Sequence, residues 1–91
     1  MERTYTVVVT RDPEDGCYVV TVPALDDCST YGDTLPQVLE RAQEAILAYL
    51  EGLAALGKDA PPDMDSVAVR LGASPEASVY RVSVREEAAV A

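Results

Sequence analysis

The sequence contains no histidine, tryptophan or phenylalanine, and only two of its 91 residues are cysteine. Without histidine the chain cannot supply a Ser-His or Cys-His nucleophilic pair. Cys17 and Cys28 lie too far apart for the close ligand spacing of structural zinc motifs. A glycine-rich phosphate-binding loop of either common type is also missing. We therefore expect no catalytic residue, no metal site and no cofactor.

Long hydrophobic runs are absent too, since no stretch approaches the roughly 20 apolar residues of a membrane-spanning helix. The N-terminal segment MERTYTVVVTRD is polar at once and then alternates, unlike a signal peptide. Cys17 and Cys28 would lie about 13 Å apart along a hairpin, beyond disulfide reach. We expect two small, partly buried thiols, and a cytoplasmic protein that does not bind membranes.

The chain has few positive charges, and its formal net charge is −9. Affinity for nucleic acid depends on lysine and arginine displacing counterions from phosphates, so this balance disfavours DNA or RNA binding. An acidic balance is typical of a solvated surface, and it also favours association with a basic partner. Both interpretations remain open from composition alone.

What the sequence does contain is strand-like alternation at both ends of the chain. Segments 4–10 and 17–23 flank the turn sequence RDPEDG and predict a β-hairpin. Segment 27–32 predicts a short third strand, and segments 66–71 and 78–84 predict strands near the C-terminus. Consecutive valines in the hairpin indicate that its second face is also partly apolar, which suggests self-association or a partner there.

Between these strands the apolar residues recur at helical spacing from Leu35 to Leu56. Thr34 followed by Gln37 has capping-box spacing, and Gly57 is a natural stop. Leu47 lies off the apolar stripe, so we expect its side chain to be exposed. It is then either an ordinary surface leucine or part of an interface. The prediction is an α+β fold of order β-β-β-α-β, with an optional extra C-terminal strand and the helix on one sheet face.

Acidic residues are concentrated near the predicted turns. Turn and cap chemistry accounts for their positions, since Asp and Asn favour turns and acids favour helix N-termini. Metal-dependent nuclease chemistry would need carboxylates that converge on rigid strands, which this pattern does not provide. The remaining interpretation is contact with a partner, and its candidate residues are Asp12, Glu14, Asp15, Asp26, Asp27, Tyr31 and Asp33.

The stretch from Tyr5 to Pro62 resembles the HicB-like antitoxin family, also called the UPF0150 group. The resemblance rests on YTVVV, EDGCYVVTVPAL, a cysteine before TYGDT, and LPQVLERAQEAILAYLEGLAALGKDAPP. One departure is Asp26-Asp27 where family members usually have Pro-Gly. A second is that no helix pair or basic strand for DNA binding follows Pro62.

This resemblance implies a partial ribonuclease-H-like core domain over residues 1–71, with a C-terminal extension over 72–91. It implies a non-catalytic protein that binds a small basic HicA-type mRNA interferase toxin, and we expect a homo-oligomer, a dimer or tetramer, without direct DNA binding. The alternatives are a self-assembling structural or regulatory module without a toxin, and, more remotely, a metal-dependent nuclease.

Overall fold

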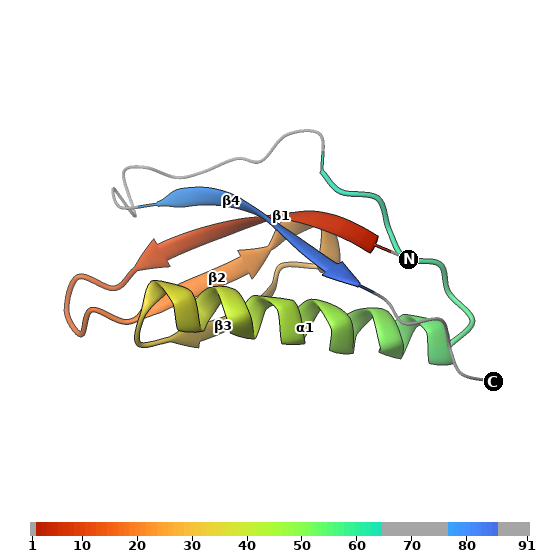
Figure 1. Ribbon diagram of the computed structural model, residues 1–91, viewed down its shortest axis with the longest axis horizontal. Helices are drawn as coiled ribbons and strands as arrows, with labels where there is room; N and C mark the ends of the chain where they lie inside the picture. Colours follow the sequence, from red (N-terminus) through yellow and green to blue (C-terminus); the bar gives the residue numbers. More distant parts are fainter. Residues whose placement is uncertain (1, 65–76, 86–91) are drawn as a thin grey trace.

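The computed structural model describes residues 2–64 and 77–85, which form one antiparallel sheet with one long helix on one face (Figure 1). The predicted α+β class and the order β-β-β-α-β are confirmed. A short 3-10 turn, η1, separates the second and third strands. The elements are β1 (Glu2–Arg11), β2 (Tyr18–Val22), η1 (Pro23–Leu25), β3 (Cys28–Gly32), α1 (Leu35–Ala55) and β4 (Ser78–Arg85).

The described strands lie in the order β3-β2-β1-β4 across the sheet, so β3 and β4 are the outermost of these four. β1 pairs with β2 from Val8 to Arg11, and with β4 along almost its whole length. Within the described residues, the strand that follows α1 is the predicted segment 78–84, which lies in the predicted extension. The predicted strand 66–71 lies outside the described residues.

Turn chemistry fixes the hairpin between β1 and β2. The amide of Gly16 donates to the carbonyl of Asp12 at 2.9 Å, and Gly16 has a φ of 76°, which glycine adopts without steric cost. β2 ends at Val22 because Pro23, the next residue, has no N–H for the ladder. The local sequence therefore sets both ends of β2.

The core lies between the inner face of the sheet and α1. Alternate residues of a strand point to opposite faces, so Tyr5, Val7 and Val9 of β1 are buried while Val8 turns outward. The helix contributes its own buried stripe at spacing i+4. The fully buried side chains of the core include Tyr5, Val7, Val20, Val22, Leu25, Val38 and Ile46.

Thr34 is the N-cap residue of α1, and its Oγ1 accepts from the amide of Gln37 at 3.2 Å. Gln37 Oε1 in turn accepts from the amide of Asp33 at 2.7 Å. Two predictions about the helix surface are wrong. Leu47, near the middle of α1, is half-buried and packs against the core, whereas Leu56, predicted to lie on the apolar stripe, is 72% exposed. The stripe rotates around a long helix, and the sheet extends beneath its flank but not beneath its last turn.

Gly32 lets the start of α1 approach the end of β3. A Cβ at Gly32 would lie 3.0 Å from the backbone nitrogen of Val38 and 3.2 Å from its Cα. Backbone atoms cannot swing aside as a flexible side chain would. The helix and the edge strand are therefore held at a distance that only glycine permits.

Replacing Gly32 with alanine is expected to lower the free energy of unfolding by about 1–3 kcal/mol, because the added methyl group pushes α1 away from β3. The matched control is Gly52→Ala, since nothing lies within 4 Å of a Cβ at that helical position. There the expected change is a gain of up to about 1 kcal/mol from reduced backbone entropy. Urea denaturation measures both, and equal effects of the two substitutions would contradict the close-approach argument.

Candidate partner-binding surface

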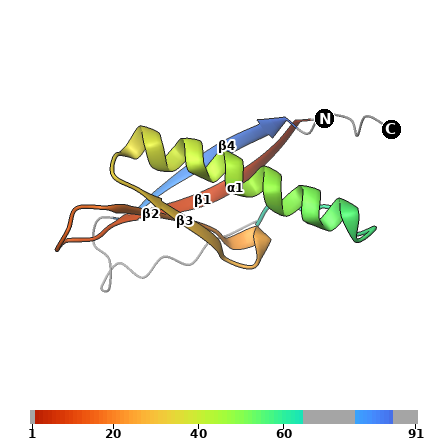
Figure 2. The same cartoon turned by 90° about the horizontal axis from the view of Figure 1, so that it is seen from below.

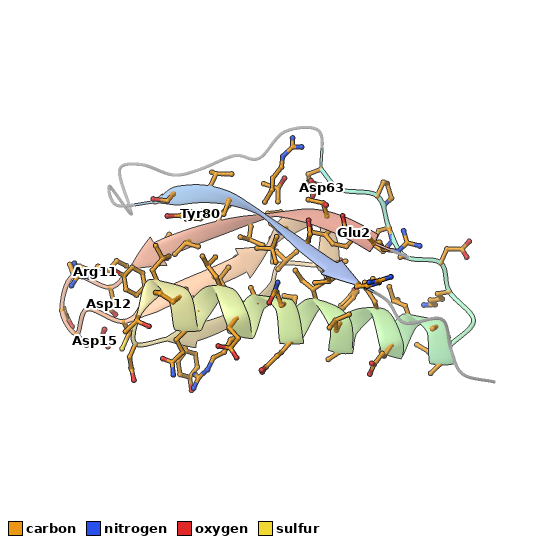
Figure 3. All side chains as sticks on the ribbon, in the orientation of Figure 1. Glu2, Arg11, Asp12, Asp15, Asp63 and Tyr80 are labelled. Carbon is orange, nitrogen blue, oxygen red and sulfur yellow. The ribbon has the colours of Figure 1, made fainter. Side chains whose placement is uncertain are left out.

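The structure divides the seven predicted partner-binding residues between two ends of the sheet. Asp12, Glu14 and Asp15 lie in the turn between β1 and β2, as Figure 3 shows for Asp12 and Asp15, and Asp33 follows β3 at the same end. Asp26 and Asp27 precede β3 at the opposite end. Five residues of strand separate the two groups, which is about 17 Å.

The acids of the hairpin turn use their side chains to build it. Asp12 Oδ1 accepts from the amide of Glu14 at 2.8 Å, and Asp15 Oδ1 accepts from the amide of Cys17 at 2.8 Å. Arg11 lies over the ring of Tyr18, 5.7 Å from its centroid, and does not pair with these acids. The turn therefore holds its exposed carboxylates in fixed positions.

Asp33 extends this acidic end onto the next strand. Cys17 Sγ lies 3.7 Å from Asp33 Oδ1 as a weak donor. Partial burial and the carboxylates of Asp15 and Asp33 raise the pKa of the Cys17 thiol above its ordinary value. Cys17 therefore remains protonated at neutral pH and is a poor nucleophile. Both cysteines are free and partly buried.

At the other end, Asp26 and Asp27 adopt the left-handed conformation, with φ of 54° and 55°. The hydroxyl of Tyr49 on α1 donates to Asp26 Oδ2 at 2.9 Å, and this hydrogen bond, with partial burial, raises the pKa of Tyr49. Asp26 thus ties the loop to the helix. Asp27 is exposed.

The outer face of the sheet, opposite α1, carries exposed apolar side chains beside the acidic end. Tyr31 of β3 is 67% exposed and pairs across the ladder with Val19, which is also exposed. Val79 of β4 is exposed on the same face. The predicted apolar character of the second face is confirmed. The arrangement is an exposed tyrosine with four carboxylates next to it, a combination suited to a basic protein surface.

Sequence reasoning missed Asp63, which lies on the flank of β1 that β2 does not reach (Figure 3). Its carboxylate accepts from the amide of Thr6 at 2.8 Å and from the Thr6 hydroxyl at 2.7 Å. The hydroxyl of Tyr5 donates to the carbonyl of Pro61 at 2.6 Å. The segment after α1 is thereby fastened to β1. No periodic pattern in the sequence marks this contact.

Within residues 2–64 and 77–85, no three or more Cys, Asp or Glu side chains gather in a way that could hold a metal ion. In the same residues no helix is long and apolar enough to cross a membrane.

The HicB-like antitoxin family of bacterial toxin–antitoxin systems matches residues 5–84. The chain belongs to this family. A UPF0150 protein of Thermoplasma acidophilum is 49% identical over 59 residues, covering 65% of this chain and 84% of the relative. A UPF0150 protein of Archaeoglobus fulgidus is 47% identical over 47 residues, covering 52% and 67%.

Solved structures of an antitoxin and of toxin–antitoxin complexes share the fold. The N-terminal domain of the Burkholderia pseudomallei antitoxin HicB has a TM-score of 0.65 at 28% identity, and the match covers 92% of this chain and all of that one. A Streptococcus pneumoniae toxin–antitoxin complex gives 0.79 at 19% identity over 93% and 70% of the chains. A HicA3–HicB3 toxin–antitoxin complex gives 0.71 at 21% identity over 92% and 100%.

The contacts of Asp63 predict a pH-dependent contribution to stability. Partial burial alone would raise its pKa, but hydrogen bonds from Thr6 and Met64 and the charge of Arg81 outweigh it, so the pKa is lowered from its ordinary value of 3.8. A carboxylate with a lowered folded-state pKa stabilises the fold above its unfolded pKa, and this stability is lost as pH falls through the folded value.

Replacing Asp63 with asparagine is therefore expected to lower the free energy of unfolding at pH 7 by about 1 kcal/mol. The difference from the native protein should shrink below about pH 4, as Asp63 in the native protein becomes protonated. Asp59→Asn, an exposed position in the same segment, serves as the control. Urea denaturation between pH 2.5 and 7 measures the difference, and a difference that stays constant across that range would exclude the charged hydrogen bonds as its source.

Proposed function

We propose that this chain is a non-catalytic antitoxin that binds and neutralises a small basic toxin of the HicA mRNA interferase type. Membership of the HicB-like antitoxin family over residues 5–84 is the observation that carries the proposal. Toxin–antitoxin complexes of the same fold support it. The proposed place of action is the cytoplasm, where such a toxin meets mRNA.

The proposed contact surface is the hairpin end of the sheet. It combines four carboxylates, those of Asp12, Glu14, Asp15 and Asp33, with the exposed ring of Tyr31. In protein–protein interfaces, aromatic side chains are enriched in the buried centre, and charged side chains lie mainly at the solvent-exposed rim. We favour this end over Asp26 and Asp27, because Asp26 is engaged by Tyr49 and no aromatic side chain in the described chain is freely exposed beside Asp27.

Neutralisation in this proposal needs no chemistry from the antitoxin. An interferase must bring RNA phosphates against a basic surface, and the acidic hairpin end would cover that surface and repel RNA from it. The rival proposal is a self-assembling module without a toxin. The gene neighbourhood distinguishes the two proposals. A short reading frame for a basic protein, of under about 90 codons, beside this gene favours the antitoxin, and its absence favours the module.

The test is binding of the purified neighbouring basic protein by calorimetry, together with rescue of growth when the two proteins are co-expressed. Glu14→Lys combined with Tyr31→Ala should weaken binding by tenfold or more and abolish rescue, since it removes a rim charge and the aromatic anchor. Glu51→Lys, on the exposed face of α1, makes the same charge change and should retain both.

Higher salt should weaken the native complex, because exposed charge pairs are screened. A complex that forms equally well with both variants would exclude the hairpin end as the contact surface. No binding and no rescue by the native chain would leave the module without a toxin as the better proposal.

A further inference from the structure

Tyr31 is the one aromatic ring of this chain that is largely exposed to solvent. The chain has no phenylalanine or tryptophan, and all five of its tyrosines lie within the described residues. The other four are buried or half-buried, and they are Tyr5, Tyr18, Tyr49 and Tyr80. Tyr31 is 67% exposed, and its neighbour across the ladder, Val19, is exposed as well. An exposed aromatic ring with an apolar neighbour is typical of a surface that a partner covers.

The register of the sheet places two rows of side chains on the outer face at the hairpin end. The first row runs from Tyr31 on β3 to Val19 on β2 and Thr10 on β1, which are direct partners across the ladders. Two residues further along, the same register places Asp33 opposite Cys17. Figure 2 shows the turn between β1 and β2 and the turn between β3 and α1 at the same end of the sheet. A row with an aromatic ring therefore lies beside a row with a carboxylate.

Asp33 is held in place in a way that leaves one of its carboxylate oxygens available. Its amide donates to Oε1 of Gln37 at 2.7 Å, and its Oδ1 lies 3.7 Å from Sγ of Cys17. The Cys17 thiol has a raised pKa, so at neutral pH it keeps its proton and remains a donor. Within the described residues, Oδ2 of Asp33 has no hydrogen bond. The carboxylate can therefore accept a further charged donor without losing an existing contact.

The backbone edge of β3 beside Tyr31 is already occupied. Nη1 of Arg41 on α1 donates to the carbonyl of Tyr31 at 2.8 Å. A partner strand that paired along this edge would have to displace a charged hydrogen bond. Contact at Tyr31 is therefore more favourable through side chains on the outer face than through strand pairing.

The chemistry of the two rows favours an arginine of the partner over a lysine. A guanidinium is planar and weakly hydrated, stacks on aromatic rings and presents several N–H donors to a carboxylate, whereas an ammonium is a strongly hydrated point charge. Tyr31 and Asp33 lie about 7 Å apart along one face, so a guanidinium against the ring also faces the carboxylate. The hairpin end already contains one such stack, in which Arg11 lies 5.7 Å from the centroid of the Tyr18 ring.

We propose that Tyr31 and Asp33 together receive one arginine side chain of the basic partner, with its guanidinium stacked on the Tyr31 ring and hydrogen-bonded to Asp33. The identity of the partner rests on the proposed function, and the arginine site adds the residue type that is recognised. Val19 and Thr10 pack against the methylene groups of the arginine, which carry no charge. Cys17 is a positioning residue, since it holds Asp33 through the other carboxylate oxygen.

Two acetylated peptides of equal charge, tetra-arginine and tetra-lysine, test the residue preference without the toxin. NMR titration of the whole isotope-labelled chain measures affinity and place of binding. Tetra-arginine is expected to bind about two- to fivefold more tightly, because it can stack on Tyr31, with the largest shift changes at residues 17–19 and 31–33. Tyr31→Leu should abolish this preference, and the control Val79→Leu, also exposed on the outer face, should retain it. Equal affinity of the native chain for both peptides, or shift changes centred on Asp26 and Asp27, would overturn the proposal.

Calorimetry with the neighbouring basic protein tests the same site in the complex. Asp33→Asn removes the charge that faces the arginine and should weaken binding about fivefold or more. Cys17→Ala removes the donor that orients Asp33 and should weaken binding by a smaller factor, whereas Cys17→Ser keeps a donor there and should restore it. In the Asp33→Asn background, Cys17→Ala should have no further effect, because the two residues act through one carboxylate. Circular dichroism confirms that each variant folds.

The two experiments separate the arginine site from the antitoxin function. If the native chain binds the basic protein and these variants bind it equally well, the arginine site is wrong and the antitoxin function stands. If the native chain does not bind the basic protein but prefers tetra-arginine through Tyr31, the antitoxin function fails and the arginine site stands.

Discussion

The packing of α1 on the inner face of the sheet is the contact on which the rest of the structure depends. A stripe of Val38, Ala42, Ile46 and Leu50 meets the alternate residues of four strands, and Gly32 lets the helix approach closely enough to seal that core. One helix can cover one face only, and in the described part of the chain Val19, Tyr31 and Val79 on the other face are exposed. The helix also contacts both outer strands of the described sheet through hydrogen bonds. Arg41 donates to the carbonyl of Tyr31 in β3, and Gln43 donates to the carbonyl of Ser83 in β4.

This division supports the proposed action by binding. The core accounts for nearly all the buried apolar side chains, and the acids of the turns serve two purposes at once. Asp12 and Asp15 hold the turn through hydrogen bonds to backbone amides, and the same bonds fix the positions of their exposed carboxylates. A basic partner would meet preorganised charges, which lowers the entropic cost of association. Tyr31 and Val19 supply apolar area beside these charges.

Local patterns in the sequence predict the elements well, because alternation, turn residues and caps act over a few positions. The hairpin around RDPEDG, the helix from Leu35 and the end of β2 at Pro23 are of this kind. What the sequence does not reveal depends on tertiary distance. Leu47 was expected to be exposed because a helix considered alone does not show how far the sheet extends beneath its flank. The candidate acids separate into two groups because β3 lies between them, and the contact of Asp63 with Thr6 joins residues 57 positions apart.

Hydrogen–deuterium exchange of the chain with and without its neighbouring basic protein tests the central claim most directly. The account predicts slower exchange at residues 11–19 and 29–34, where the acidic hairpin end and Tyr31 lie, and unchanged exchange in the exposed last turn of α1. Slower exchange confined to the loop of Asp26 and Asp27, or no change anywhere in the chain, would contradict it.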